Sequence, residues 1–166
     1  MFGNKDIYCL GLIENIDLIN KKYNDWKIYV YYENIPCAIL DILTKKSNTY
    51  LFECKHKNNI YESLLWRLYP LETDIDILIS RDADSRITDR EIKFVNDWII
   101  SDKVFHIIRD NYKHRWPILA GMFGIKVKEF NKLYTIKSID TYINFDVYNM
   151  VVKKKEKTST QCVDMY

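Results

Sequence analysis

The chain has 166 residues, 48% hydrophobic and 29% charged, a composition typical of one globular domain with a substantial core. Residues 153–166 hold four Lys against one Glu and one Asp, so the rest of the chain is balanced at 21 basic and 21 acidic residues. A neutral body excludes a broad nucleic-acid-binding face, and no apolar run approaches the roughly 18 residues of a transmembrane helix.

The sequence predicts alternating strands and helices in chain order. Strands are expected at 7–12, 26–32, 49–54, 74–80 and 104–108. Helices are expected at 14–23, from Pro36, from Tyr61 to just before Pro70, and after a capping box formed by Thr88 and Glu91. Such alternation favours an α/β fold with a mostly parallel sheet and helices on both faces, in which ligands bind outside the carboxyl ends of the strands.

The C-terminal part is harder to interpret. Residues 131–151 fit either a helix or two strands, and residues 153–166 read as a disordered tail after a single domain at 1–152. The four cysteines, at 9, 37, 54 and 162, show no disulfide or zinc spacing with the three histidines. A reducing compartment is therefore expected, and without a recognisable secretory signal we expect a cytoplasmic protein.

Two carboxylates one residue apart follow the predicted strand at 74–80. Asp82 and Asp84 are flanked by Arg81 and Arg86, and all six arginines lie between residues 67 and 115. Carboxylates suit Mg²⁺ or Mn²⁺, and guanidinium groups pair with phosphate bidentately. The motif therefore suggests a site for a metal-bound, phosphate-bearing ligand. A plain Asp turn with surface salt bridges is the open alternative.

Further along, Arg109 and Asp110 follow the predicted strand at 104–108, and both strand ends are expected at the carboxyl edge of one sheet. We expect Asp82, Asp84 and Asp110 to share a cleft there. Gly121 and Gly124 fit either a close backbone approach to a ligand or helix and turn packing.

Three stretches carry a resemblance in their order along the chain. The first is Leu65-Trp66-Arg67-Leu68-Tyr69-Pro70, and the second is Ile79-Ser80-Arg81-Asp82-Ala83-Asp84-Ser85-Arg86, running on to Glu91 and Trp98. The third is Phe105-His106-Ile107-Ile108-Arg109-Asp110, followed by Pro117-Ile118-Leu119-Ala120-Gly121-Met122-Phe123-Gly124. Over roughly residues 5–126 the chain resembles glycosyltransferase-like proteins of the GT-A type found in bacteria and large DNA viruses. The resemblance implies a Rossmann-like nucleotide-binding fold with a shortened C-terminal part.

The resemblance implies a protein that binds a nucleotide sugar through Mn²⁺ or Mg²⁺, in the host cytoplasm if the source is viral. Asp82 and Asp84 would hold the ion, and Arg67, Arg81 and Arg86 would lie near the phosphates. The sugar or acceptor side would be lined by Arg109, Asp110, His114 and Gly121, with Asp110 in the catalytic role. The acceptor is unknown.

The chain departs from that pattern in the loop after Asp110, which lacks a His-Pro pair, and in residues 127–166, which lack an Asp-Gln pair. We therefore expect donor binding or slow donor hydrolysis rather than efficient transfer, unless a partner chain completes the cleft.

Two alternatives remain open. Asp41, Glu53 and Lys55 loosely match the carboxylate and lysine set of an Mg²⁺-dependent nuclease. The chain also fits a non-catalytic domain that binds a nucleotide sugar or a protein partner. His106, which alternates with apolar residues, is expected to be a packed strand histidine rather than a catalytic base.

Overall fold

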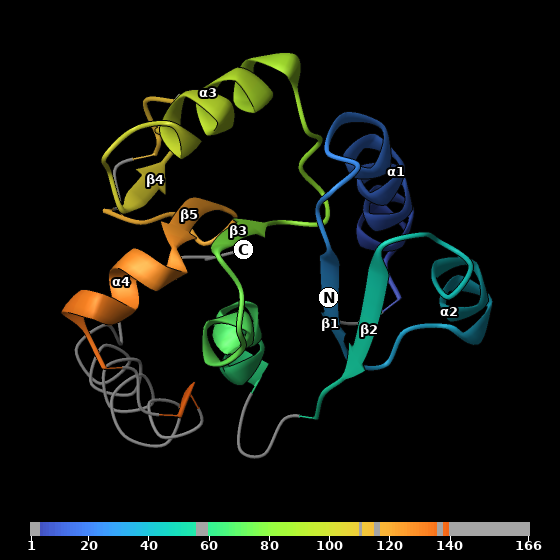
Figure 1. Cartoon of the computed structure of the whole chain (residues 1–166). Helices are drawn as coiled ribbons and strands as arrows, with labels where there is room; N and C mark the ends of the chain where they lie inside the picture. The colour runs from blue at the N-terminus through green and yellow to red at the C-terminus, as the bar shows by residue number, and fades with distance from the viewer. Residues whose placement is uncertain (1–3, 56–59, 110, 115–116, 136–137, 140–166) are drawn as a thin grey trace, which may run out of the picture.

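The computed structural model describes residues 4–55, 60–109, 111–114, 117–135 and 138–139. Its elements are shown in Figure 1. In chain order they are α1 (Asp6–Lys22), β1 (Ile28–Tyr32), α2 (Cys37–Leu43), β2 (Thr49–Glu53), η1 (Ile60–Leu64), η2 (Trp66–Glu72), β3 (Ile77–Arg81), α3 (Asp89–Ile99), β4 (Phe105–Ile107), β5 (Met122–Lys126) and α4 (Val127–Leu133), where η marks a 3₁₀ helix.

The strands form two separate sheets rather than one. β1 and β2 make a parallel pair, while β3, β5 and β4, in that order, make a three-stranded antiparallel sheet. The expected mostly parallel sheet with helices on both faces is therefore wrong. The error arises because alternation along the chain predicts element types, whereas strand order depends on pairings between distant segments.

Helix α1 replaces the strand expected at 7–12. Its apolar residues continue into the helical spacing of Leu12, Ile13 and Ile16, so one amphipathic helix runs through both segments. Asp6 lies in its first turn and Lys21 and Lys22 in its last, which suits the helix dipole. A short apolar run reads equally well as a strand or as part of a helix, and here it is part of a helix.

The parallel pair packs one face against helices. Ile16, Val30 and Leu43 are the buried centre of a core shared by α1, α2, β1 and β2. The opposite face of the pair carries Tyr29, Tyr31, Tyr50 and Phe52, whose rings contact one another, and Tyr31 also contacts Tyr69 of η2. These aromatic side chains thus pack on one another across the two strands.

The antiparallel sheet is built around β5, a strand that was not among those expected from the sequence. β5 lies between β3 and β4 and places Gly124 opposite both Ile79 and His106. Helix α3 covers this face, where the Trp98 ring stacks on His106 and leaves room for no side chain at Gly124. The other face carries Leu78, Phe123 and Ile125, which form a second core with Leu71 and Val127.

Several local predictions are confirmed. The Thr88 hydroxyl accepts the backbone N–H of Glu91 at 3.2 Å and caps α3, which buries Val95 and Trp98. β1, β2, β3 and β4 lie within or beside the strands expected there. The helix expected from Tyr61 is instead two 3₁₀ segments, and η2 continues past Pro70 to Glu72.

No helix in the described part of the chain is long and apolar enough to cross a membrane. Cys9, Cys37 and Cys54 are free thiols, and Cys9 is buried in α1 rather than in a strand. Most of 131–151 and all of the predicted tail lie outside the described residues.

Candidate functional site

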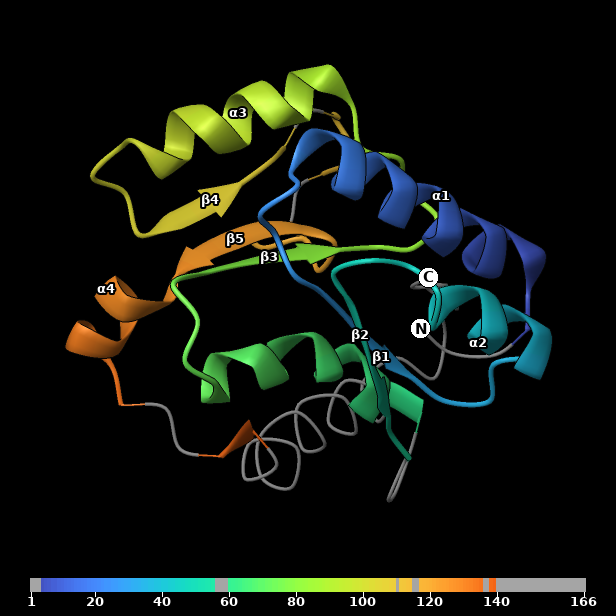
Figure 2. The same cartoon turned by 45° about the vertical axis from the view of Figure 1, so that its right-hand side comes forward.

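The Asp-x-Asp motif lies in a loop that begins where β3 ends. Arg81 is the last residue of β3, and residues 82–86, hereafter the acidic loop, lead toward α3. The chain leaving β3 runs to α1 before it turns to α3 in both views (Figures 1 and 2). Asp84 is exposed and Asp82 is half-exposed, with 46% of its side chain accessible. Both carboxylates thus follow the end of a strand, as the sequence predicted.

One side of the acidic loop is held by η2 and the segment before β5. Arg67 Nη1 donates to Asp82 Oδ1 at 3.1 Å, and the same nitrogen lies 3.4 Å from Ser80 Oγ. The Ser80 hydroxyl donates to the carbonyl of Ala120 at 2.5 Å. Gly121 lies against the Asp82 carboxylate so closely that a Cβ there would be 2.0 Å from Oδ2. Asp82 is therefore fixed between a guanidinium and a glycine backbone.

A second side is held by a largely buried ion pair. Arg81 Nη1 bonds the Glu91 carboxylate of α3, and Arg81 Nη2 donates to the carbonyl of Ser85 at 3.2 Å. Only 14% and 12% of the two side chains are exposed. Burial and the nearby Glu91 raise the pKa of Tyr23, at the end of α1, to about 12. Arg81 thus faces the interior and supports the acidic loop.

The third side is α1. Asn15 Nδ2 donates to the carbonyls of Ala83 and Ser85, Arg86 pairs with Glu14, and Gly11 abuts the Ala83 carbonyl. None of these α1 residues was expected at the site. A polar residue inside a helical pattern is normally taken for a surface residue. Only the bond from Asn15 to the Ala83 carbonyl, 68 residues away, shows that Asn15 belongs to the site.

The expected acceptor side is only partly described. Arg109 is exposed, and its Nη2 donates to the carbonyl of Pro117 at 2.6 Å. His114 is half-buried, and its backbone N–H donates to the carbonyl of Asn111. Asp110 lies outside the described residues, so its predicted approach to Asp82 and Asp84 stays a prediction.

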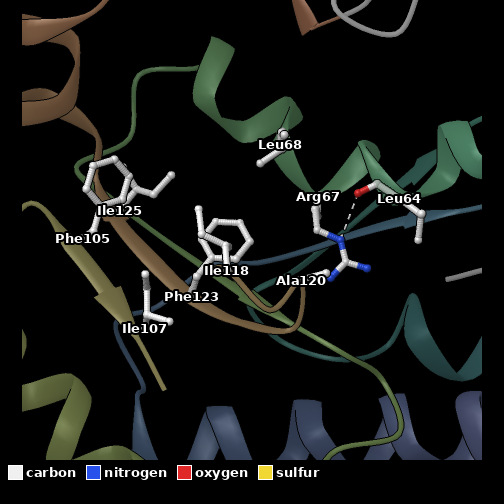
Figure 3. A pocket seen from close by; sticks show the side chains of 9 residues that line it. All are labelled: Leu64, Arg67, Leu68, Phe105, Ile107, Ile118, Ala120, Phe123 and Ile125. Carbon is white, nitrogen blue, oxygen red and sulfur yellow. Dashed lines mark hydrogen bonds between the residues drawn. The ribbon is translucent and has the colours of Figure 1, made fainter. Parts of the chain in front are cut away.

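An open pocket of about 290 Å³ lies beside Arg67 (Figure 3). Its walls are apolar and come from η1, η2, the sheet face carrying Phe123 and the segment before β5. The lining side chains are Leu64, Leu68, Phe105, Ile107, Ile118, Ala120, Phe123 and Ile125, with Arg67 at one end. In Figure 3 the Arg67 Nε bonds the Leu64 carbonyl, at 3.1 Å. The pocket thus places apolar surface next to the residue that holds Asp82.

Within the described residues, no group of three or more His, Cys, Asp or Glu side chains is arranged to hold a metal ion. If Asp82 and Asp84 held an ion, water and ligand phosphates would have to fill its remaining coordination positions, as is usual for Mg²⁺ in proteins. The nuclease candidates Asp41, Glu53 and Lys55 are all exposed, on α2 and at the end of β2. Burial lowers the pKa of His106, as befits a packed histidine.

Comparison of the chain with known protein families, with curated proteins and with solved structures gave no match.

Proposed function

We propose that this chain binds a nucleotide sugar through a divalent cation held by Asp82 and Asp84, and that it is a glycosyltransferase-like protein. The observation that carries the proposal is the support of the acidic loop. Three separate elements fix a loop that presents an exposed Asp84 and a half-exposed Asp82. Ordinary surface turns need no such support, whereas ligand sites depend on side chains held in place by their neighbours.

The arginines divide into two roles under this proposal. Arg81 is largely buried against Glu91 and serves the loop, while Arg67 and Arg86 are more exposed. Arg67 bonds Asp82, and Arg86 bonds Glu14 and the Ala83 carbonyl of the acidic loop. Guanidinium groups bind diphosphate oxygens in a fixed fork, so Arg67 and Arg86 are the proposed phosphate contacts. A cation at Asp82 would share that carboxylate with Arg67, which bonds one of its two oxygens. When bound, the ion supplies charge that neutralises the diphosphate.

The proposal is tested by titrating the protein with UDP, GDP and their sugar conjugates, with and without Mn²⁺, in a calorimeter. We expect binding that requires Mn²⁺ and falls at least tenfold in Asp84→Asn, which removes the charge but keeps the shape. Asp74→Asn is the matched control, because Asp74 is also exposed but precedes β3 instead of following it. Equal affinities for the two variants would reject the site.

Nucleotide release measured with and without simple glycan acceptors then separates binding, donor hydrolysis and transfer. Slow release that is independent of the acceptor is expected. Rapid release that depends on an added acceptor would show that the chain is a complete transferase.

A further inference from the structure

One face of α1 contacts the acidic loop. Gly11, Glu14 and Asn15 are spaced at i, i+3 and i+4, so they share a face of the helix. Each contacts the loop or its end: Gly11 abuts the Ala83 carbonyl, Glu14 pairs with Arg86, and the Asn15 amide bonds two loop carbonyls. α1 belongs to the core of the parallel pair, whereas the loop follows the antiparallel sheet.

The Asn15 amide brackets Asp84. Its Nδ2 donates to the carbonyl of Ala83 at 3.1 Å and to that of Ser85 at 2.8 Å, the residues before and after Asp84. Both hydrogens of one amide group therefore fix the Ala83–Asp84 and Ser85–Arg86 peptide groups, which lie on either side of the Asp84–Ser85 peptide group and restrict the backbone around Asp84. The backbone bond within the loop, from Ser85 N–H to the Asp82 carbonyl, is long at 3.4 Å.

Asn15 is unfavourable for the stability of α1 at this position. It is 5% exposed and lies in the middle of a helix, where asparagine is disfavoured. Its Oδ1 is buried and finds no hydrogen-bond partner among the described residues, which costs further stability. An apolar residue would serve the core better, so the benefit of Asn15 lies in the loop that it holds.

Gly11 allows the approach. A Cβ at this position would lie 2.4 Å from the Ala83 carbonyl oxygen and 2.7 Å from Arg86 Nη1. Any larger residue would separate α1 from the loop and lengthen the bonds made by Asn15.

We propose that Asn15 is a positioning residue that holds the acidic loop in one conformation and thereby orients Asp84 toward the cation. The cation role rests on the function proposed above, whereas the holding of the loop does not. Because Asn15 joins α1 to the acidic loop, ligand bound at Asp84 also protects α1 from local unfolding.

The test compares Asn15→Ala with Asn20→Ala. Asn20 lies on the same helix, and its Nδ2 likewise donates to a loop carbonyl, that of Ser47 at 3.2 Å. Alanine favours helix, so both variants are expected to fold. Hydrogen exchange is measured by mass spectrometry on peptides covering 82–88 and α1. Mn²⁺-dependent UDP and GDP binding is measured on the same samples.

Asn15→Ala is expected to speed exchange in the peptide 82–88 by about tenfold and to weaken nucleotide binding by a similar factor, as befits the loss of ordinary hydrogen bonds. Asn20→Ala should change neither. Gly11→Ala, which keeps the amide but forces α1 away, should reproduce the effect of Asn15→Ala.

Faster exchange spread evenly over the chain, or no change in 82–88, would overturn the proposal, and so would faster loop exchange with unaltered nucleotide affinity. If the unaltered protein binds no nucleotide, the proposed function fails, and exchange in 82–88 alone decides whether Asn15 holds the loop.

Discussion

Gly121 provides a sharp test of the site because its lack of a side chain makes room for Asp82. In Gly121→Ala the new Cβ would lie 2.0 Å from Asp82 Oδ2, 2.2 Å from Cγ and 2.7 Å from Oδ1. Ordinary contact begins at 3.4 Å, so the carboxylate must retreat by about 1.4 Å. Arg67 holds the same carboxylate at 3.1 Å, and such a retreat pulls it away from this partner or forces both to move.

The expected cost follows from these contacts. The atoms that must move are the half-exposed end of the Asp82 side chain, which can swing into solvent, so the main loss of stability is the partly exposed ion pair with Arg67, up to about 1 kcal/mol. The loss of backbone freedom in the unfolded chain offsets about 0.4–1 kcal/mol of this. The free energy of unfolding should therefore change by less than about 1 kcal/mol. Cation-dependent nucleotide binding should fall much more, because Asp82 is displaced.

Urea denaturation followed by circular dichroism measures the free energy of unfolding, and calorimetric titration with Mn²⁺ and UDP or GDP measures nucleotide affinity. Gly124→Ala is the matched control, because its Cβ would meet the Trp98 ring at 2.8 Å on the face covered by α3. It should destabilise the protein but leave nucleotide affinity unchanged. The reasoning is refuted if Gly121→Ala binds nucleotide as tightly as the unaltered protein does.

Three further predictions concern the support of the acidic loop and its sheet. Glu91→Gln should lower the free energy of unfolding by about 3 kcal/mol, because it leaves Arg81 with a largely buried charge that nothing balances. Arg81→Met combined with Glu91→Leu should recover most of that stability, and equal urea midpoints for the single and double variants would argue against the ion pair. Burial lowers the pKa of His106 below its ordinary 6.5, so the unfolded chain takes up the proton first and stability should fall as pH drops below 6.5. His106→Phe keeps the ring over Trp98 and should lessen that decline in urea titrations between pH 7 and 5, and an identical decline would contradict the assignment. Thr88→Ala should lower the free energy of unfolding by about 1 kcal/mol through loss of the cap of α3, whereas Thr88→Ser should keep the cap and the stability. Identical thermal unfolding of the two variants would exclude the cap.

The parts of the fold that the sequence predicted are those governed by local rules. The cap at Thr88 and the strands near 28–32 and 49–53 depend on neighbouring residues, so their patterns were sufficient. The place of Asp82 and Asp84 after β3 followed from the end of an apolar run. Glu91 shows the limit of such rules, because its carboxylate, expected at the helix cap, pairs with Arg81.

The parts that sequence reasoning missed depend on tertiary contacts. The run at 7–12 joined a helix because Leu12, Ile13 and Ile16 extend its apolar face onto β1 and α2. β5 lies between β3 and β4, with its Gly124 against Trp98 of α3, and these contacts join segments that are far apart in the sequence. Asn15 acts on carbonyls nearly seventy positions away, and no local pattern indicates that partnership.

The most direct test of the central claim is to locate the ion. Crystals grown with Mn²⁺ and UDP or GDP, measured at the manganese absorption edge, give an anomalous peak wherever the cation is bound. We predict a peak about 2–2.5 Å from carboxylate oxygens of Asp82 and Asp84, with the diphosphate completing the coordination. A peak beside Asp41 and Glu53, or nucleotide bound with no ion at the acidic loop, would contradict the account.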